Sequence, residues 1–295
     1  MPLKSILLGI LLALFGQIKA QVSAYPFDES SLLWKIDGPG VKKGCFLFGT
    51  MHLIEKDYFV FPKSLQQIVK KTGVLIMELN GTPKQATVKS SLQLQVGSFF
   101  DFFTKEQSDS IVRWAAANLH MDSSNFCTFI QPMKPFVMAQ LMAQIQFKKS
   151  VESYEMTFEN LAKNEGIPIV GLETVEEQLK FIDQLPIATQ VSMVMETIRL
   201  GDKSHAKLIE LEQTYQSQNI DALHQLMQDE TGIVATEQTS LVDNRNANWI
   251  PKIEKFIQKD RTLIAVGAGH LGGEKGIIRL LQAKGYRVTP IELTN

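Results

Sequence analysis

Two histidines in this sequence occupy matching positions after short apolar runs. The stretches CFLFGTMH and LIAVGAGH end in His52 and His270, and a glycine, Gly49 or Gly267, stands three residues before each. Glycine accepts dihedral angles that other residues resist, so a glycine-rich turn after a strand lets backbone and an exposed imidazole approach a ligand closely. The repeated Gly-x-x-His pattern therefore predicts one site assembled from both ends of the chain.

Two glutamates end further apolar runs and could join the histidines. Glu78 follows VLIM, and Glu173 follows IPIVGL. In open α/β sheets, ligands bind beyond the carboxyl ends of the strands, so the four side chains should converge on one rim if these strands are neighbours. Two imidazoles and a carboxylate suit a divalent metal ion with an open position for water, and a second carboxylate could act as a base. The same four side chains could also perform metal-free hydrolysis, with a histidine as general base.

Each of these residues also has a plain structural explanation. A single histidine after a strand is more often hydrogen-bonded within the fold than a ligand, and a glutamate at a strand end often caps a helix. The repetition of Gly-x-x-His after apolar runs favours a functional interpretation.

A dinucleotide-binding fingerprint overlaps the second histidine motif. Gly267, Gly269 and Gly272 form G-x-G-x-x-G between a predicted strand and helix, and Glu292 follows twenty residues later. The ring of His270 would stand where a pyrophosphate should approach the backbone. We therefore rank dinucleotide binding below a hydrolytic site, in which the glycines serve to expose the histidine.

The segment LVDNRNANW contains an arginine and an asparagine suited to ligand binding. Arg245 offers five donors and a permanent charge for a carboxylate or an oxyanion, and Asn246 can donate or accept. From the residues alone, the simpler interpretation is a solvated helix with a buried Trp249.

The strands and helices predicted around these residues indicate an α/β fold. The short apolar runs are separated by helical periodicity, which is typical of strands in a mostly parallel or mixed central sheet. Residues 31–36 and 45–48 are predicted to form a hairpin, and residues of about 85–165 and 175–259 read as helical insertions. Strands come from both chain ends, so we predict a single domain over 21–295 with a large inserted helical layer.

Composition and the N-terminus limit the functional classes. The 295 residues are 44% hydrophobic with a net charge of −1, and the basic residues are scattered among acids, which argues against nucleic-acid binding. Residues 1–20 have the layout of a secretory signal peptide, and their apolar run, residues 6–15, is too short to span a bilayer, so we expect a periplasmic or secreted protein without a transmembrane anchor once the signal is removed. The two cysteines, Cys45 and Cys127, exclude a disulfide scaffold, and free buried thiols are at least as plausible as a bridge.

Taken together, the motifs resemble the TraB/GumN family, whose animal relatives include the Tiki proteases. The resemblance runs from about residue 32 to 291 and is carried by LLWKI, FLFGTMH, IMELN, IPIVGLETVEEQL, DNRNANW and AVGAGHLGGEKGIIRLLQAKGYRVTPI. It implies a hydrolase-like site built from His52, His270 and Glu78. Arg245 and Asn246 match the Arg-Asn pair of the family, and Glu173 matches its Leu-Glu-Thr segment.

The resemblance implies an exported, metal-dependent peptidase. His52, Glu78 and His270 would hold a divalent ion such as Mn, Co or Zn, Arg245 would stabilise an oxyanion, and Glu173 would act as a base or orient the ligands. The partner would be a peptide or small-molecule substrate, and the oligomeric state is left open. Two alternatives stand: a metal-independent ester or lactone hydrolase, as in the related erythromycin esterases, and a non-catalytic protein that binds a small molecule or haem, as in ChaN-like relatives.

Overall fold

The computed structural model describes residues 29–42, 44–80, 91–230 and 242–293. The predicted signal peptide, residues 1–20, lies outside these ranges, so its prediction stands untested. Within the described ranges, no helix is both long enough and apolar enough to cross a membrane.

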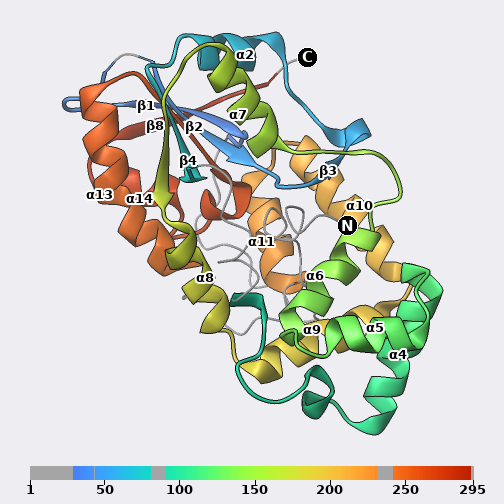
Figure 1. Ribbon diagram of the computed structural model, residues 1–295. Helices are drawn as coiled ribbons and strands as arrows, with labels where there is room; N and C mark the ends of the chain where they lie inside the picture. Colours follow the sequence, from blue (N-terminus) through green and yellow to red (C-terminus); the bar gives the residue numbers. More distant parts are fainter. Residues whose placement is uncertain (1–28, 43, 81–90, 231–241, 294–295) are drawn as a thin grey trace.

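A six-stranded mixed sheet forms the centre of the molecule (Figure 1). Its strand order is β6-β4-β7-β2-β1-β8, in which β6, β4, β7 and β2 are parallel neighbours and β1 is antiparallel to both β2 and β8. The predicted α/β class is confirmed, as is the contribution of strands from both chain ends. The strands are β1 (Leu33–Asp37), β2 (Cys45–Thr50), β4 (Val74–Leu79), β6 (Ile169–Glu173), β7 (Thr262–Gly267) and β8 (Arg287–Ile291).

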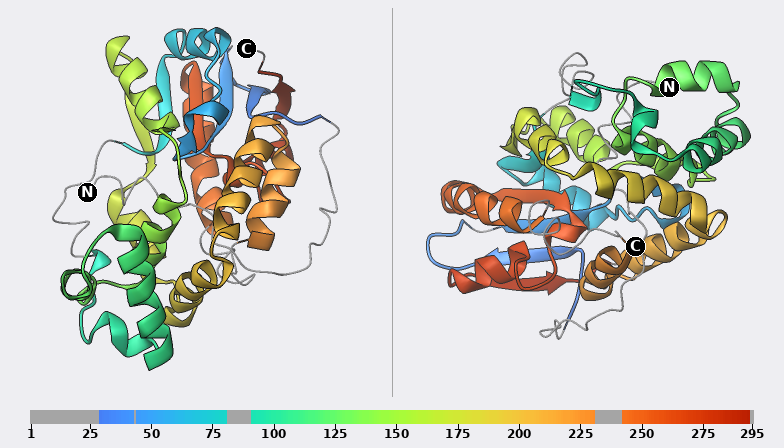
Figure 2. Two further views of the ribbon diagram at one scale, coloured as in Figure 1. Left: turned by 90° about the vertical axis from the view of Figure 1, so that its right-hand side faces the viewer. Right: turned by 90° about the horizontal axis from the view of Figure 1, so that it is seen from below.

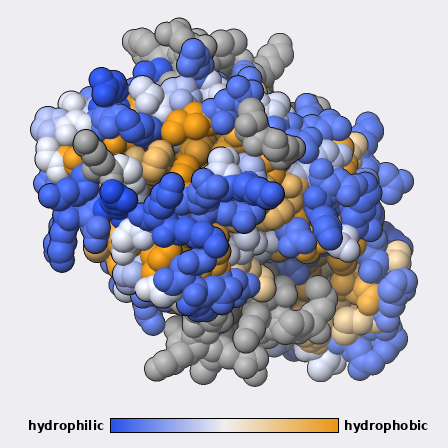
Figure 3. Space-filling view, turned by 90° about the horizontal axis from the view of Figure 1, so that it is seen from above, coloured by the Kyte–Doolittle hydropathy of each residue, from blue (hydrophilic) through white to orange (hydrophobic). Residues whose placement is uncertain are grey.

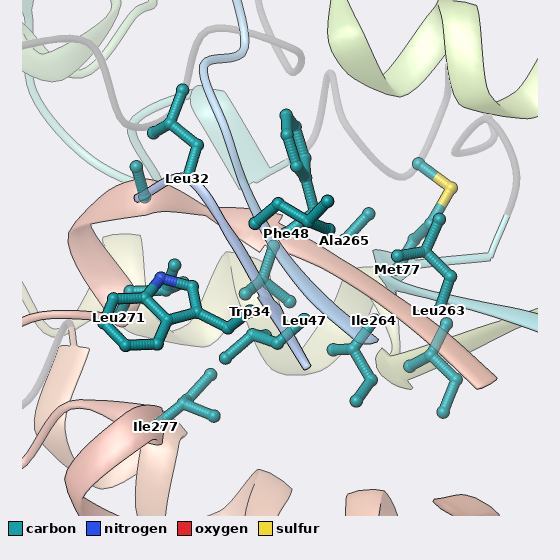
Figure 4. Close-up of a cluster of buried hydrophobic side chains, with 14 of the residues drawn as sticks. Leu32, Trp34, Leu47, Phe48, Met77, Leu263, Ile264, Ala265, Leu271 and Ile277 are labelled. Atoms are coloured by element: carbon teal, nitrogen blue, oxygen red, sulfur yellow. The ribbon is translucent and has the colours of Figure 1, made fainter. Parts of the chain in front are cut away.

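The central strands are apolar over most of their length because helices cover both faces of the sheet. Leu47 and Ile264 point to one face with Trp34, whereas Phe48 and Ala265 point to the other (Figure 4). Helices α13 (Asn244–Lys259) and α14 (Ile277–Ala283) lie on the first face, and α7 (Tyr154–Asn164) packs on the second, where the ring of Phe158 lies 5.5 Å from that of Phe48. Alternate side chains of each strand therefore enter different layers of core.

Helices between β4 and the C-terminal part of the chain build a second hydrophobic cluster away from the sheet (Figure 2). The Phe and Met residues of the segment PFVMAQLM are buried in it, so this predicted helix is a core element. The helices of the cluster are α4 (Lys105–Leu119), α5 (Ser123–Ile130), α6 (Pro135–Ile145), α8 (Val175–Asp183) and α9 (Ile187–Leu200), with η2 (Phe99–Phe102) before them. Three further helices lie near the sheet: α2 (Lys63–Lys70), α10 (Lys203–Gln216) and α11 (Ile220–Glu230).

Few large hydrophobic side chains remain at the surface. The face seen in Figure 3 is mostly hydrophilic, with hydrophobic residues in small areas between hydrophilic ones. Both cysteines are free thiols; Cys45 is buried, whereas Cys127 is only half-buried. Burial raises the pKa of the Cys45 thiol, which donates to the carbonyl oxygen of Asp260 over 3.3 Å.

A small two-stranded ribbon forms where no strand was expected, and one of its strands lies within the predicted helical insertion of about 85–165. It pairs β3 (Ile54–Glu55) with β5 (Val151–Glu152) in antiparallel fashion. The buried carboxyl group of Glu212 links this ribbon to α10, because its Oε1 accepts the backbone N–H of Glu55 over 2.6 Å. The Glu55 side chain in turn accepts the backbone N–H groups of Lys148 and Lys149. Two-residue strands carry too little periodicity to be recognised in a sequence.

The buried Glu212 should make stability depend on pH. Burial raises the pKa of this carboxyl to about 7, with the Glu55 N–H opposing and the Glu55 carboxylate adding to the rise. In the folded state Glu212 therefore keeps its proton up to about pH 7, whereas in the unfolded state it releases the proton near pH 4.5. The stabilisation from this group is fully present below pH 4.5 and is lost as the pH rises to 7. We expect wild type to lose on the order of 1 to 3 kcal/mol over this window through this group, and Glu212→Gln to remove that loss.

Urea unfolding at pH 5 and pH 8 measures the difference. The matched control is Glu210→Gln on the exposed side of the same helix, which should keep the wild-type dependence. An equal pH dependence of Glu212→Gln and wild type would contradict the assignment.

Candidate functional site

The polar residues predicted for the site follow strands that run parallel, so they meet at one edge of the sheet. Glu78 is the second-last residue of β4 and Glu173 the last of β6, and the register pairs Leu79 with Glu173. His270 ends η4 (Ala268–His270), directly after β7, and His52 lies just past the end of β2. The structure thus places all four at the carboxyl edge of neighbouring strands.

Arg245 joins the two glutamates. Its Nη2 donates to Oε2 of Glu78 and to Oε1 of Glu173, each over 2.6 Å, and its Nε donates to Oε2 of Glu173 over 3.1 Å. Arg245, Glu78 and Glu173 are only 3%, 6% and 7% exposed. The guanidinium of Arg245 lies 4.7 Å from the ring centre of Trp249. Arg245 lies in the first turn of α13. This helix was expected to be solvated, but its first turn presents Arg245 and Asn246 to the edge of the sheet, where both are buried.

Asn246 sets the orientation and tautomer of His270. Nδ1 of the histidine lies 2.7 Å from Oδ1 of Asn246, an atom that only accepts, so Nδ1 carries the proton and Nε2 the lone pair. The asparagine amide is fixed in turn because its Nδ2 donates to the carbonyl oxygens of Lys275 and His270 over 2.9 and 3.3 Å. Burial lowers the pKa of His270 to about 3, against the opposing effect of Glu78. The ring is therefore neutral at physiological pH.

The two glutamates around Arg245 differ in ionisation. Burial alone would raise the pKa of Glu78, but the charge of Arg245 outweighs it and brings the pKa to about 2. Oε1 of Glu78 also accepts the backbone N–H of Gly267 over 2.8 Å and lies 3.8 Å from Nε2 of His270. For Glu173, burial prevails over Arg245 and the pKa is raised. One carboxylate is thus firmly ionised, and its neighbour is the better proton acceptor.

His52 has a partner that the sequence did not suggest. Its Nδ1 lies 3.0 Å from Oε1 of Glu155 but is not aligned for a hydrogen bond, and it is buried without another partner in the described part of the chain. Glu155 accepts the hydroxyls of Thr50 and Ser153 over 2.6 and 3.3 Å. Burial would lower the pKa of His52, but Glu155 outweighs it and raises the pKa to about 9. No apolar run or spacing marks Glu155, because it stands in the first turn of α7.

The two histidines line one cavity of about 50 Å³. Its walls come from the ends of β2 and β7 and from helices α10 and α11. Glu78, Glu173, Arg245 and Asn246 lie behind His270 and do not line it. The full lining is Thr50, Met51, His52, Leu211, Tyr215, Leu223, Met227, Val242, Gly267, Ala268, Gly269 and His270.

The glycines around His270 allow neighbouring groups to come close. A Cβ on Gly267 would lie 3.2 Å from Oε1 of Glu78, and one on Gly269 would lie 2.6 Å from Cε of Met227. A Cβ on Gly272 would meet His224 at 2.9 Å, and one on Gly49 would meet Leu271 at 3.0 Å. Gly269 and Gly272 thus receive side chains of α11, where a dinucleotide loop would present free backbone N–H groups to a phosphate.

The donor atoms of the site match part of what a divalent ion requires. A neutral His270 held through Nδ1 and an ionised Glu78 beside it have the chemistry of metal ligands, whereas His52, whose pKa is about 9, would have to release a proton to bind an ion. One contact would have to open, because Nη1 of Arg245 lies 3.2 Å from Nε2 of His270. Within the described ranges, no group of three His, Cys, Asp or Glu side chains is already gathered at ligand distance. The residues therefore fit an ion by type, with a proton to be lost from His52 and with Arg245 as the group that must move.

Fold and site together define an α/β protein with a buried histidine, carboxylate and arginine network at the carboxyl edge of parallel strands. The chain belongs to the TraB/PrgY/gumN family, whose model matches residues 32–290, which confirms the family predicted from the motifs. It is 22% identical over 327 aligned positions to a protein named metalloprotease TIKI homolog from Amphimedon queenslandica. The alignment covers 90% of this chain and 62% of that relative, so the chain spans less than two thirds of its length. No solved structure matches the chain significantly.

Proposed function

We propose that this protein is a hydrolase that cleaves peptide bonds with the help of a divalent metal ion. The observation that carries the proposal is the arrangement of two histidines on one cavity, with an ionised glutamate and an arginine directly behind His270. The similarity to a relative named as a metalloprotease supports the same class of reaction. With the signal-like residues 1–20, the protein would work in the periplasm or outside the cell.

Each residue would have a definable part. His52, His270 and Glu78 would hold the ion. When bound, it would polarise a carbonyl group and lower the pKa of water, so that hydroxide is available to attack that carbonyl. Asn246 keeps the proton of His270 on Nδ1 and so leaves the lone pair on Nε2, and Glu155 holds His52 through its Nδ1. Arg245 keeps Glu78 ionised, and its Nη1, once released from His270, would be available to a developing oxyanion. Glu173, whose pKa is raised, would accept a proton.

A metal-independent ester or lactone hydrolase is the second candidate, favoured by one contact. The hydrogen bond from Nη1 of Arg245 occupies the lone pair of His270 Nε2 that an ion would need. In that case Glu173 would be the base, because the pKa values of His270 and Glu78, about 3 and about 2, are too low for efficient proton abstraction near neutral pH.

Metal analysis of the purified protein separates the two candidates. Wild type is compared with the double variant His52→Ala/His270→Ala after chelation and reloading with Mn, Co or Zn, using elemental analysis and cleavage of a synthetic peptide mixture. We expect about one ion and peptide cleavage in wild type, and neither in the double variant. The control His120→Asn changes an exposed histidine whose left-handed backbone suits asparagine.

Two results would decide against the proposal. Full activity after exhaustive chelation, lost only in the double variant, would select the metal-free candidate. Equal activity in wild type and the double variant would exclude both.

A further inference from the structure

The cavity lined by His52 and His270 is mostly apolar, with Thr50 and Tyr215 as its other polar side chains. Its walls include Leu211 of α10 and Leu223 and Met227 of α11, and no Asp, Glu, Lys or Arg of the described residues lines it. Ligand pockets are commonly apolar with a few polar groups that set orientation, and here the polar groups are the two histidines. The surface beside the proposed reacting bond is therefore suited to an apolar group.

The other polar atoms on the cavity are already engaged within the protein. The hydroxyl of Tyr215 donates to the carbonyl oxygen of Gly49 over 2.8 Å, and that of Thr50 donates to Glu155 over 2.6 Å. A charged or amide side chain entering here would give up its hydrogen bonds to water and find only the two imidazoles in exchange, which is costly. Polar groups are thus disfavoured in this cavity.

The size of the cavity limits which apolar group can enter. At about 50 Å³ it is well below the roughly 150 Å³ of cavities that accept a benzene ring. Met227 sets this limit, because its terminal methyl group lies against Gly269. The two are so close that a Cβ on Gly269 would be only 2.6 Å from Cε of Met227. A small aliphatic group fits, whereas an aromatic side chain requires Met227 to be shortened or displaced.

We propose that this cavity is a subsite for a small aliphatic side chain, such as that of alanine or valine, next to the scissile bond of a peptide substrate. The inference rests on the proposed hydrolase function and adds to it a class of substrate. Because both histidines line the cavity, a side chain seated here would bring its adjoining peptide bond to the proposed catalytic groups. Met227 is the residue that determines the size preference.

The subsite is tested by profiling cleavage positions in a synthetic peptide mixture by mass spectrometry. Wild type loaded with metal should prefer Ala or Val at one position beside the cleaved bond over Asp, Lys or Phe by about 10-fold or more, since a hydrophobic pocket discriminates about 10- to 200-fold per methylene. Met227→Ala should shift the relative kcat/KM toward Leu and Phe by about 10-fold. The control Met156→Ala changes a methionine that is 57% exposed and should keep the wild-type profile.

A second measurement needs no turnover. N-acetylvaline amide should shift the methyl resonance of Met227 in a spectrum of wild type with labelled methionine methyl groups, whereas N-acetylaspartate amide should not. Cleavage without an aliphatic preference, or a folded Met227→Ala variant with an unchanged profile, would overturn the subsite and leave the hydrolase proposal standing. Binding of the valine amide without cleavage of any peptide would support the subsite and overturn the hydrolase. No cleavage of any peptide together with no shift of the Met227 resonance would overturn both.

Discussion

Replacing Arg245 by methionine is expected to lower the free energy of unfolding by about 3 to 5 kcal/mol, the usual cost of breaking a buried ion pair by removing one partner. The guanidinium is the cation shared by Glu78 and Glu173, and both carboxylates are buried. Methionine fills a similar volume but leaves two like charges facing each other in the interior. Urea unfolding at pH 7, followed by circular dichroism, measures the loss.

Acid dependence provides a second signature of the same substitution. In wild type, Arg245 holds the pKa of Glu78 at about 2, below its ordinary 4.5, so this group adds stability above pH 4.5 that is lost as pH falls toward 2. Without the arginine, burial, which raises the pKa, is opposed only by the smaller effects of His270, His52 and the Gly267 N–H, so Arg245→Met should become more stable relative to wild type on acidification. The control Arg113→Met, on the exposed side of α4, should differ from wild type by less than about 0.5 kcal/mol. A loss below about 1 kcal/mol in Arg245→Met would show that the network does not hold the site together.

Replacing Glu78 by glutamine is expected to reduce hydrolysis by about 10²- to 10⁴-fold, the range associated with loss of a group that assists the reaction directly. Glutamine keeps the shape of the side chain and an oxygen for the N–H of Gly267, but it loses the negative charge beside His270. Arg245 keeps Glu173 as a partner, so the fold should survive this change better than the loss of the arginine. Peptide cleavage rates and urea midpoints measured on the same preparation separate the two effects.

The matched control for this variant is Glu176→Gln, an exposed glutamate at the start of α8. Its activity should equal that of wild type. If Glu78→Gln cleaved substrate within about two-fold of wild type, the carboxylate would have no part in the reaction, and Glu173 would become the residue to test.

The sequence by itself determined the strands and the two histidine motifs. Short apolar runs that end in glycine predicted β2 and β7. A strand buried on both faces is apolar at nearly every position, and its pairing with neighbouring strands stops where a glycine lets the chain turn. Glu78 and Glu173 were found by the same rule, as polar residues at the ends of such runs. Local sequence contains this information because it depends only on neighbouring residues.

Only the tertiary structure decided how these residues face one another. The strand order β6-β4-β7-β2 brings the ends of β2, β4, β6 and β7 together, which no local pattern specifies. Glu155 meets His52 because the β3–β5 ribbon brings the start of α7 beside the end of β2. Arg245, expected to lie free for an oxyanion, is found clamped between two carboxylates, and the glycines after His270 receive α11. Such contacts join residues far apart in the chain, and they follow from which layers of core can pack together, so they cannot be read from the spacing of residues.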